Sequence, residues 1–139
     1  MKRLISVLEL MLAAGILLVA IPVATQLTPM AKKANKVEIT QGPELERNDA
    51  YLTIITWTSN NPGGTPQHYG VVHYGTDPKN LTETSKSPIR LNMTHDYTVF
   101  RVRMDALKPQ TTYYYTVDSM GSNGESDGVK SPVKQFTTP

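Results

Sequence analysis

The stretch Leu107-Lys-Pro-Gln-Thr-Thr-Tyr-Tyr-Tyr-Thr-Val117 decides the fold of this chain. Every second residue is placed to face the same side of an extended chain, which is the period of a strand with one buried face. Pro109 has a fixed φ and no N–H group, so it suits a turn before the strand. A tyrosine just after such a turn is typical of a tyrosine corner, in which the hydroxyl bonds to the upstream backbone. The pattern therefore predicts a β-sandwich, with the buried side of this stretch formed by Leu107, Pro109, Thr111, Tyr113, Tyr115 and Val117.

Six further segments carry strand patterns, which gives an all-β, seven-stranded Greek-key β-sandwich of the fibronectin type III or immunoglobulin-like kind. The lone tryptophan, Trp57, is expected in the core, where its large area stabilises most. The expected strands are 37–40, 51–58, 69–75, a short edge strand within 81–91, 99–104, 113–119 and 133–137. Gln41-Gly-Pro43 should end the first strand, Tyr51 should face the core, and 120–131 should form a long loop.

Composition fits one sandwich plus an appendage. The chain has 139 residues, 10 prolines and 9 glycines, which favours short strands joined by turns. The net charge of +2 gives no electrostatic reason to expect nucleic-acid binding. The absence of cysteine excludes both a disulfide framework and thiolate chemistry.

The N-terminus predicts a membrane anchor. Residues 4–24 carry one charge, Glu9, and are long enough to cross a bilayer as one transmembrane helix. Lys2 and Arg3 precede this segment, so the positive-inside rule leaves the N-terminus in the cytoplasm and the sandwich in the periplasm or outside the cell. A removed signal peptide is the alternative. The expected organisation is an anchor at 1–24, a tether at 25–36 and the sandwich at 37–139.

Glu9 is the unusual residue of the predicted span. A carboxylate inside hydrocarbon is costly, so it either stays near the cytoplasmic interface or meets a partner helix. The string Leu8-Glu-Leu-Met11 followed by an apolar run also resembles the N-terminal helix of type IV pilins. No glycine precedes that string as a processing site, which departs from the pilin pattern.

Several longer stretches resemble a known family. The sequences ITQGPE at 39–44, ITWTSNNPGG at 55–64, VVHYGTDPKNL at 71–81, LKPQTTYYYTV at 107–117 and QFTTP at 135–139 resemble a fibronectin type III domain. They are most similar to the N-terminal, non-catalytic domain of purple acid phosphatases. In that family the metal and phosphate chemistry belongs to a separate, following domain. Its Gly-Asp-x-x-Asp, Gly-Asn-His and Asp-x-Gly motifs do not occur in these 139 residues, so no enzymatic activity is expected.

No residue cluster predicts chemistry of its own. His68 and His73 should face opposite sides of one strand and His95 should lie on a distant loop, so no zinc site is expected. The 121–128 segment lacks the ligand spacing of a calcium loop. No cofactor and no small-molecule substrate are expected. Asn80 and Asn92 begin N-glycosylation sequons, which matter if the host glycosylates exported proteins.

Partner binding is the more promising prediction. Leu52, Ile54 and Tyr114 should point outward, and exposed apolar stripes often mark partner sites. In fibronectin-like sandwiches the 60–66 and 120–131 loops lie at the end where the chain enters. The tether would aim that end at the membrane, so the remaining predicted contacts are Asn61, Pro62, Asn123 and Glu125, together with Glu9 in the span.

These features predict a non-enzymatic accessory subunit. Residues 4–24 would contact the lipid bilayer and integral-membrane subunits, and the sandwich would brace the outer face of their complex. The alternatives are a secreted or surface-displayed adhesion module, including a pilin-like filament subunit, and a phosphatase relative whose catalytic domain lies on another chain.

Overall fold

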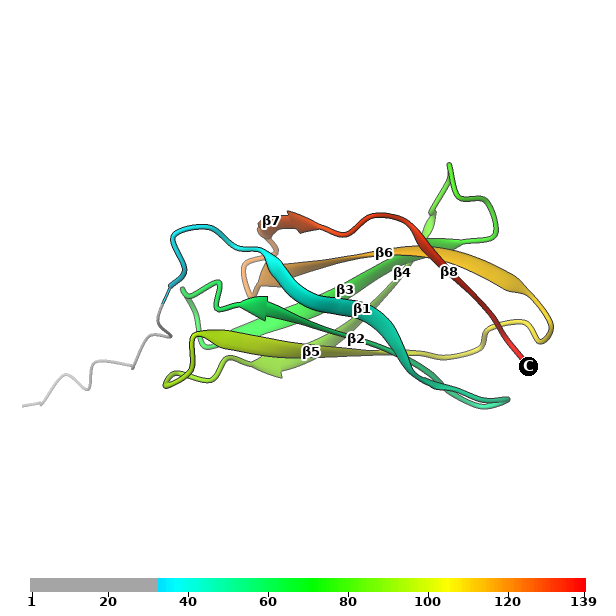
Figure 1. The fold of residues 1–139 in the computed structure, drawn as a ribbon, viewed down its shortest axis with the longest axis horizontal. Helices are drawn as coiled ribbons and strands as arrows, with labels where there is room; N and C mark the ends of the chain where they lie inside the picture. The colour runs from blue at the N-terminus through cyan, green and yellow to red at the C-terminus, as the bar shows by residue number, and fades with distance from the viewer. Residues whose placement is uncertain (1–32) are drawn as a thin grey trace, which may run out of the picture.

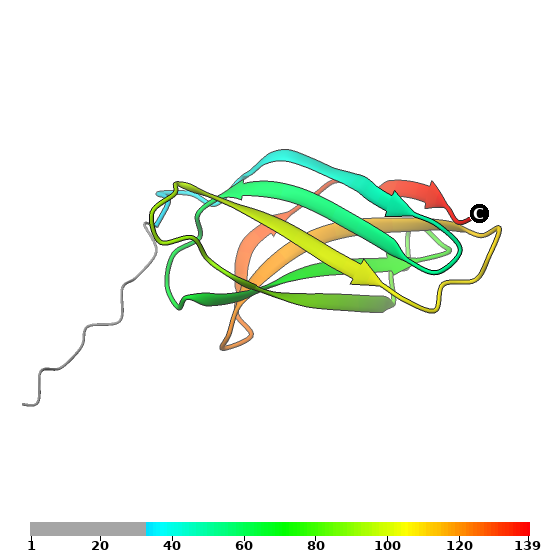
Figure 2. The same cartoon turned by 90° about the horizontal axis from the view of Figure 1, so that it is seen from below.

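A computed structural model describes residues 33–139, and these residues form a sandwich of two β-sheets (Figures 1 and 2). Strands account for all the regular structure in this range. The first four strands are β1 (Ile39–Asn48), β2 (Thr53–Asn60), β3 (Gln67–Gly75) and β4 (Glu83–Arg90). The last four are β5 (Tyr97–Met104), β6 (Thr112–Gly121), β7 (Ser126–Lys130) and β8 (Lys134–Thr137).

The smaller sheet has the order β1-β2-β5, and its neighbouring strands are antiparallel. The chain leaves this sheet after β2, forms β3 and β4 on the other side, and returns as β5. The larger sheet has the order β4-β3-β6-β7, and β8 also pairs with β6. The segment expected to hold a short edge strand is β4, which does lie at an edge.

The core lies between the two sheets. Trp57 stacks on Phe100 with ring centroids 5.2 Å apart, and Tyr113 stacks on Phe136 at 5.8 Å. A Cβ at Gly70 would come within 3.2 Å of the Trp57, Val102 and Phe100 side chains, so the missing side chain makes room for them. The predicted inward residues of the last long strands are confirmed, since their exposed fractions are all small: Phe100, Val102, Met104, Tyr113, Tyr115 and Val117.

The tyrosine corner is confirmed. The backbone N–H of Lys108 donates to the Tyr113 hydroxyl at 3.0 Å. Thr138 closes the same turn, because its hydroxyl donates to the Lys108 carbonyl at 2.6 Å and accepts from the Thr111 N–H at 3.0 Å. This stretch therefore fixes the start of β6 against the end of β8.

The first strand is longer than predicted. Gln41-Gly-Pro43 does not end it, because β1 passes through these residues with shifts in its register against β2. Gly42 adopts a φ of 80°, which favours glycine, and Pro43 is tolerated because β1 is an edge strand. The prediction that Tyr51 faces the core is wrong: it lies in the turn before β2 and is 89% exposed.

The predicted long loop at 120–131 is also wrong. Residues up to Gly121 belong to β6, a tight turn follows at 122–125, and β7 runs antiparallel to β6. The last predicted strand, 133–137, corresponds to β8, and β7 is an additional strand within the predicted loop, so the described residues form eight strands rather than seven. Ser131 lies between β7 and β8 and bonds to β6, since its N–H donates to the Val117 carbonyl and its hydroxyl accepts from the Val117 N–H. Pro132 has no N–H with which to continue the ladder.

The predicted anchor at 1–24 and most of the tether lie outside the described residues. Within residues 33–139 there is no helix long and apolar enough to cross a bilayer.

Candidate interaction surface

The two loop segments predicted for partner binding lie together at one end of the sandwich. We call it the tether end, and it consists of Lys33–Val37, the 61–66 loop, the 91–96 loop and the 122–125 turn. Figures 1 and 2 place the segment that leads into β1 here and the C-terminus at the opposite end. The expectation that the 60–66 and 120–131 segments lie where the chain enters is therefore confirmed.

Asn61 holds the tether end together. Its side-chain amide donates to the carbonyls of Asn92 and His95, at 2.9 and 3.0 Å, and its side-chain oxygen accepts from the Gly63 N–H. Its own N–H donates to the Asp96 carbonyl and its carbonyl accepts from the Ala34 N–H, both at 2.8 Å. Asn61 is fully buried, so it is a structural link between two loops and the entering chain.

The 61–66 loop and the β6–β7 hairpin line an open cavity of about 680 Å³. The entering chain closes it from a third side. The lining is mostly polar side chains and glycine backbone, and its residues are Lys33, Val37, Pro62, Gly63, Gly64, Thr65, His68, Gly121, Asn123, Glu125, Ser126 and Asp127.

His68 forms the most organised contact in this cavity. Its side chain is 3% exposed, and its Nδ1 lies 3.0 Å from the Asp127 carboxylate. Its Nε2 lies 2.9 Å from the Gly63 carbonyl oxygen. The hydroxyl of Ser119 donates to the same Asp127 oxygen at 2.6 Å. Ser119 bonds to the carboxylate and not to the imidazole, so this is not the geometry of a nucleophilic triad.

The surroundings of His68 favour its charged form. Burial by itself lowers the pKa of an imidazole, but the hydrogen bond and negative charge of Asp127 act the other way. Backbone hydrogen bonds to Gly63 and Thr65 add to them, and the net result is a pKa of His68 above its usual value.

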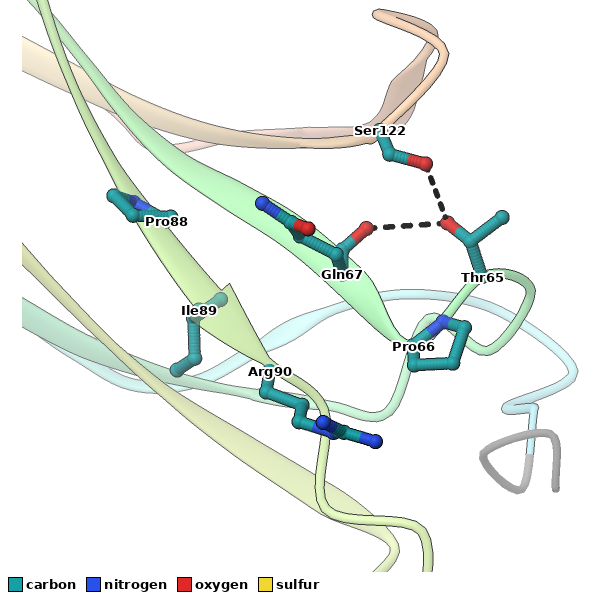
Figure 3. A pocket seen from close by; sticks show the side chains of 7 residues that line it. All are labelled: Thr65, Pro66, Gln67, Pro88, Ile89, Arg90 and Ser122. Carbon is teal, nitrogen blue, oxygen red and sulfur yellow. Dashed lines mark hydrogen bonds between the residues drawn. The ribbon is translucent and has the colours of Figure 1, made fainter. Parts of the chain in front are cut away.

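A second hollow of about 470 Å³ lies beside the cavity (Figure 3). Pro66, Pro88 and Ile89 form its apolar part, and the Arg90 side chain stands next to Pro66. The Ser122 hydroxyl donates to the Thr65 hydroxyl at 3.1 Å, which ties the 122–125 turn to the 61–66 loop.

The structure brings four predicted contact residues together at the tether end, namely Asn61, Pro62, Asn123 and Glu125. Pro62, Asn123 and Glu125 all line the larger cavity. Asn123 and Glu125 are exposed, and the Asn123 amide donates to the Glu125 carboxylate at 2.8 Å. Pro62 is buried, as is Asn61, so these two side chains are used within the chain.

The other predicted contacts lie elsewhere. Leu52 and Ile54 are half-buried, and Leu52 lines a small cavity at the opposite end. Tyr114 is half-buried on the outer side of the larger sheet, beside Gln135 of β8. Glu9 lies outside the described residues. The partner contacts of all these residues stay predictions.

The outer side of the larger sheet carries polar groups that are partly removed from water. Asp118 is half-buried, and desolvation raises its pKa although the hydrogen bond from Ser126 works against that shift. Thr116 is 3% exposed, and its hydroxyl has no hydrogen-bond partner among residues 33–139. Thr98, at the start of β5, has an unpartnered buried hydroxyl of the same kind.

No group of three or more possible metal ligands converges in the part of the chain that the structure describes. His68 points into the cavity and His73 lies on the opposite side of β3, while the His95 ring packs 5.1 Å from that of Tyr97. Both sequon asparagines are exposed. The Asn92 side-chain oxygen accepts from the Thr94 N–H and hydroxyl, which closes a local turn.

The His68–Asp127 contact is not predicted by the sequence pattern. These residues are 59 positions apart, and Asp127 was assigned to a loop. Ser126, Asp127 and Gly128 lie on alternate sides of β7, opposite the end of β6. This alternation would indicate that Asp127 faces His68, but only if the segment is first recognised as the second strand of a hairpin.

Comparisons with known proteins found a family match and structural neighbours. The family described as "Purple acid Phosphatase, N-terminal domain" matches residues 31–138. The sensor domain of the anti-sigma factor RsgI4 from Pseudobacteroides cellulosolvens is a structural neighbour with a TM-score of 0.49 and 20% identity, covering 73% of this chain and 88% of its own. No curated protein matches the chain.

The family match covers nearly all of the described sandwich and includes the tyrosine corner and the tether-end loops. It describes the non-catalytic domain of the phosphatases, which agrees with the resemblance inferred from the sequence. This chain belongs to the purple acid phosphatase N-terminal domain family.

Proposed function

We propose that this protein is a membrane-anchored, non-enzymatic interaction subunit. The apolar segment 4–24 would hold it in a bilayer, with Glu9 near the cytoplasmic interface or against a partner helix. The sandwich would stand outside the cytoplasm and bind the outer face of an integral-membrane complex. Membership of a non-catalytic domain family supports a binding role rather than a catalytic one.

One observation carries this proposal. The same cavity is lined by the two segments predicted for partner contact, 60–66 and 120–131, and by the chain that leads back toward the anchor. A partner in the membrane would therefore meet Asn123 and Glu125 at the exposed rim of that cavity first. The opposite end, which carries the turn before β2 and the C-terminus, would point away from the bilayer.

Site-specific photo-crosslinking in the native host tests this orientation. A photoreactive amino acid at Asn123 should capture a membrane subunit after extraction in mild detergent. The matched control is Tyr51, which is 89% exposed and lies at the opposite end, and it should capture little. The intact mass of the extracted protein should include residues 4–24.

Three outcomes would overturn the proposal. Release of the protein into the soluble fraction without residues 4–24 would favour a secreted or surface-displayed binding module. Equal capture from Asn123 and Tyr51 would remove the tether end as the binding surface. Capture of a metallophosphatase subunit would instead favour a phosphatase assembled from two chains.

A further inference from the structure

The His68 contacts require two donors on one imidazole ring. Nδ1 faces the Asp127 carboxylate and Nε2 faces the Gly63 carbonyl oxygen. Both partners only accept hydrogen bonds, whereas a neutral imidazole has one N–H and one lone pair. The observed geometry is therefore complete only in the doubly protonated, cationic form of His68.

Loss of the second proton leaves one contact without a donor. The N–H that remains is held most strongly by Asp127, since a hydrogen bond to a charged acceptor is about twice as strong as one to a neutral carbonyl. The contact that is lost is then the one to the Gly63 carbonyl. A lone pair on Nε2 facing that carbonyl oxygen would repel it, so the loop would move away.

We propose that His68 is a proton-operated latch, which holds the 61–66 loop closed over the tether-end cavity when the imidazole is protonated and releases it when the imidazole is neutral. The raised pKa of His68 supports the closed form at mildly acidic pH.

The charged neighbours of His68 agree with a single-proton switch. Asp127 on β7, Glu125 in the turn before it and Lys33 of the entering chain line the same cavity. On the neighbouring strands Ile89 and Gly121 lie opposite His68, and neither titrates. Arg90 follows Ile89 on β4, and the charge of Asp127 acts on Asp118 of β6. Among the described residues that line the cavity, His68 is the one imidazole.

The 61–66 loop is anchored at both ends by hydrogen bonds that involve no titratable group, so only a short segment between them can move. Asn61 anchors the start of the loop, and the bond between the Thr65 and Ser122 hydroxyls anchors its end. Between them lie Gly63 and Gly64, both with positive φ, and the space around Gly64 is open. Release should therefore open the cavity at Gly63 and Gly64 without unfolding the sandwich.

The latch needs neither a partner nor a membrane, so it is tested on the isolated full-length chain in detergent. Histidine-labelled protein is titrated by NMR, and its three histidines are assigned with single variants. The His68 resonance should titrate above about 6.5, the usual pKa of histidine. A pKa at or below that value would overturn the latch, and this measurement on the native sequence requires no variant to fold.

Hydrogen exchange then measures the opening of the 61–66 loop directly. After correction for intrinsic rates, protection of the 61–66 backbone should fall as pH rises through the His68 pKa, by about tenfold for each unit by which folding raises that pKa. In His68→Gln this pH dependence should disappear, while His73→Gln, which changes the opposite side of the same strand, should retain it. An unchanged pH dependence in His68→Gln would contradict the proposal.

Asp127→Asn provides the second variant. It keeps an oxygen for Ser119 but removes the negative charge that favours the imidazolium. The midpoint of loop release should move to lower pH, whereas Glu125→Gln at the exposed rim should move it little. Identical midpoints in the native protein and Asp127→Asn would show that the His68 charge does not control the loop.

Discussion

The two ends of the sandwich are closed in different ways. At the opposite end, which we call the corner end, the turn before β6 is held by hydrogen bonds of the Tyr113 and Thr138 hydroxyl groups. At the tether end the closing contacts are the amide of Asn61 and the imidazole of His68. Most of these contacts join residues more than 30 positions apart.

The corner end is therefore expected to contribute stability, whereas the tether end is expected to change its structure. At the corner end the Tyr113 contact joins residues five positions apart, so it should form with β6, and Thr138 ties the same turn to the end of β8 through contacts between residues 27 and 30 positions apart. The tether end combines a permanent link, Asn61, with one contact that depends on a proton. The four predictions that follow test that division, beginning with the largest expected effect.

Asn61→Ala should lower the free energy of unfolding by about 3 kcal/mol, because three backbone groups lose their hydrogen bonds to the Asn61 side chain at once. Urea denaturation followed by Trp57 fluorescence measures this change. Asn123→Ala, an exposed change at the same end, should stay within about 0.5 kcal/mol of the native value. Equal effects of the two changes would mean that Asn61 does not link the tether end.

Tyr113→Phe should lower the free energy of unfolding by about 1–2 kcal/mol, since the Lys108 N–H loses its acceptor while the ring keeps its stacking on Phe136. Tyr114→Phe is the control on the neighbouring position, and it should have little effect. If the Tyr113 variant proves as stable as the native chain, the corner end is held by Thr138 and packing.

The native protein should lose stability as pH rises through the His68 pKa. Folding raises this pKa, so the contribution is fully present below about 6.5 and disappears above the folded-state value, at about 1.4 kcal/mol per unit of difference. Urea denaturation at a series of pH values measures it. Tyr113→Phe should show the same loss and His68→Gln should not; a loss that persists in His68→Gln would place the titrating group elsewhere.

Thr98→Val should raise the free energy of unfolding by about 1 kcal/mol, because it replaces a buried hydroxyl that has no partner among residues 33–139 with a methyl group. Thr116→Val, the same change in the middle of the larger sheet, should give a similar gain. Thermal unfolding compares the two variants. Destabilisation by Thr98→Val alone would reveal a partner for that hydroxyl and a more complete polar network at the tether end.

The features predicted correctly from the sequence are those that depend on residues close together in the chain. Alternation placed Phe100, Val102 and Met104 in the core, and the spacing of Pro109 and Tyr113 predicted the tyrosine corner. These features need only the residues within one strand and its turn. The overall sandwich followed, because a chain of half-buried strands has few other ways to bury its apolar faces.

The errors arose where distant segments decide the structure. Asn61 reads as an exposed loop residue, and nothing nearby indicates that the 91–96 loop will bury it. Pro43 reads as a strand end, yet an edge position with shifted register accommodates it. Ser126 and Asp127 read as loop residues because the glycines around them obscure a short strand, so the partner of His68 was not recognised.

The placement of the chain ends has a mechanical consequence. Because the entering chain and the C-terminus lie at opposite ends, tension between them runs parallel to the strands (Figure 1). The first strand, β1, pairs antiparallel with β2, and the last strand, β8, pairs antiparallel with β6. The hydrogen bonds of both pairs are perpendicular to the direction of the tension. Such a load is shared by a whole row of bonds, whereas a pull at one end of a hairpin opens its bonds in turn. The sandwich is therefore built to resist stretching along its long axis.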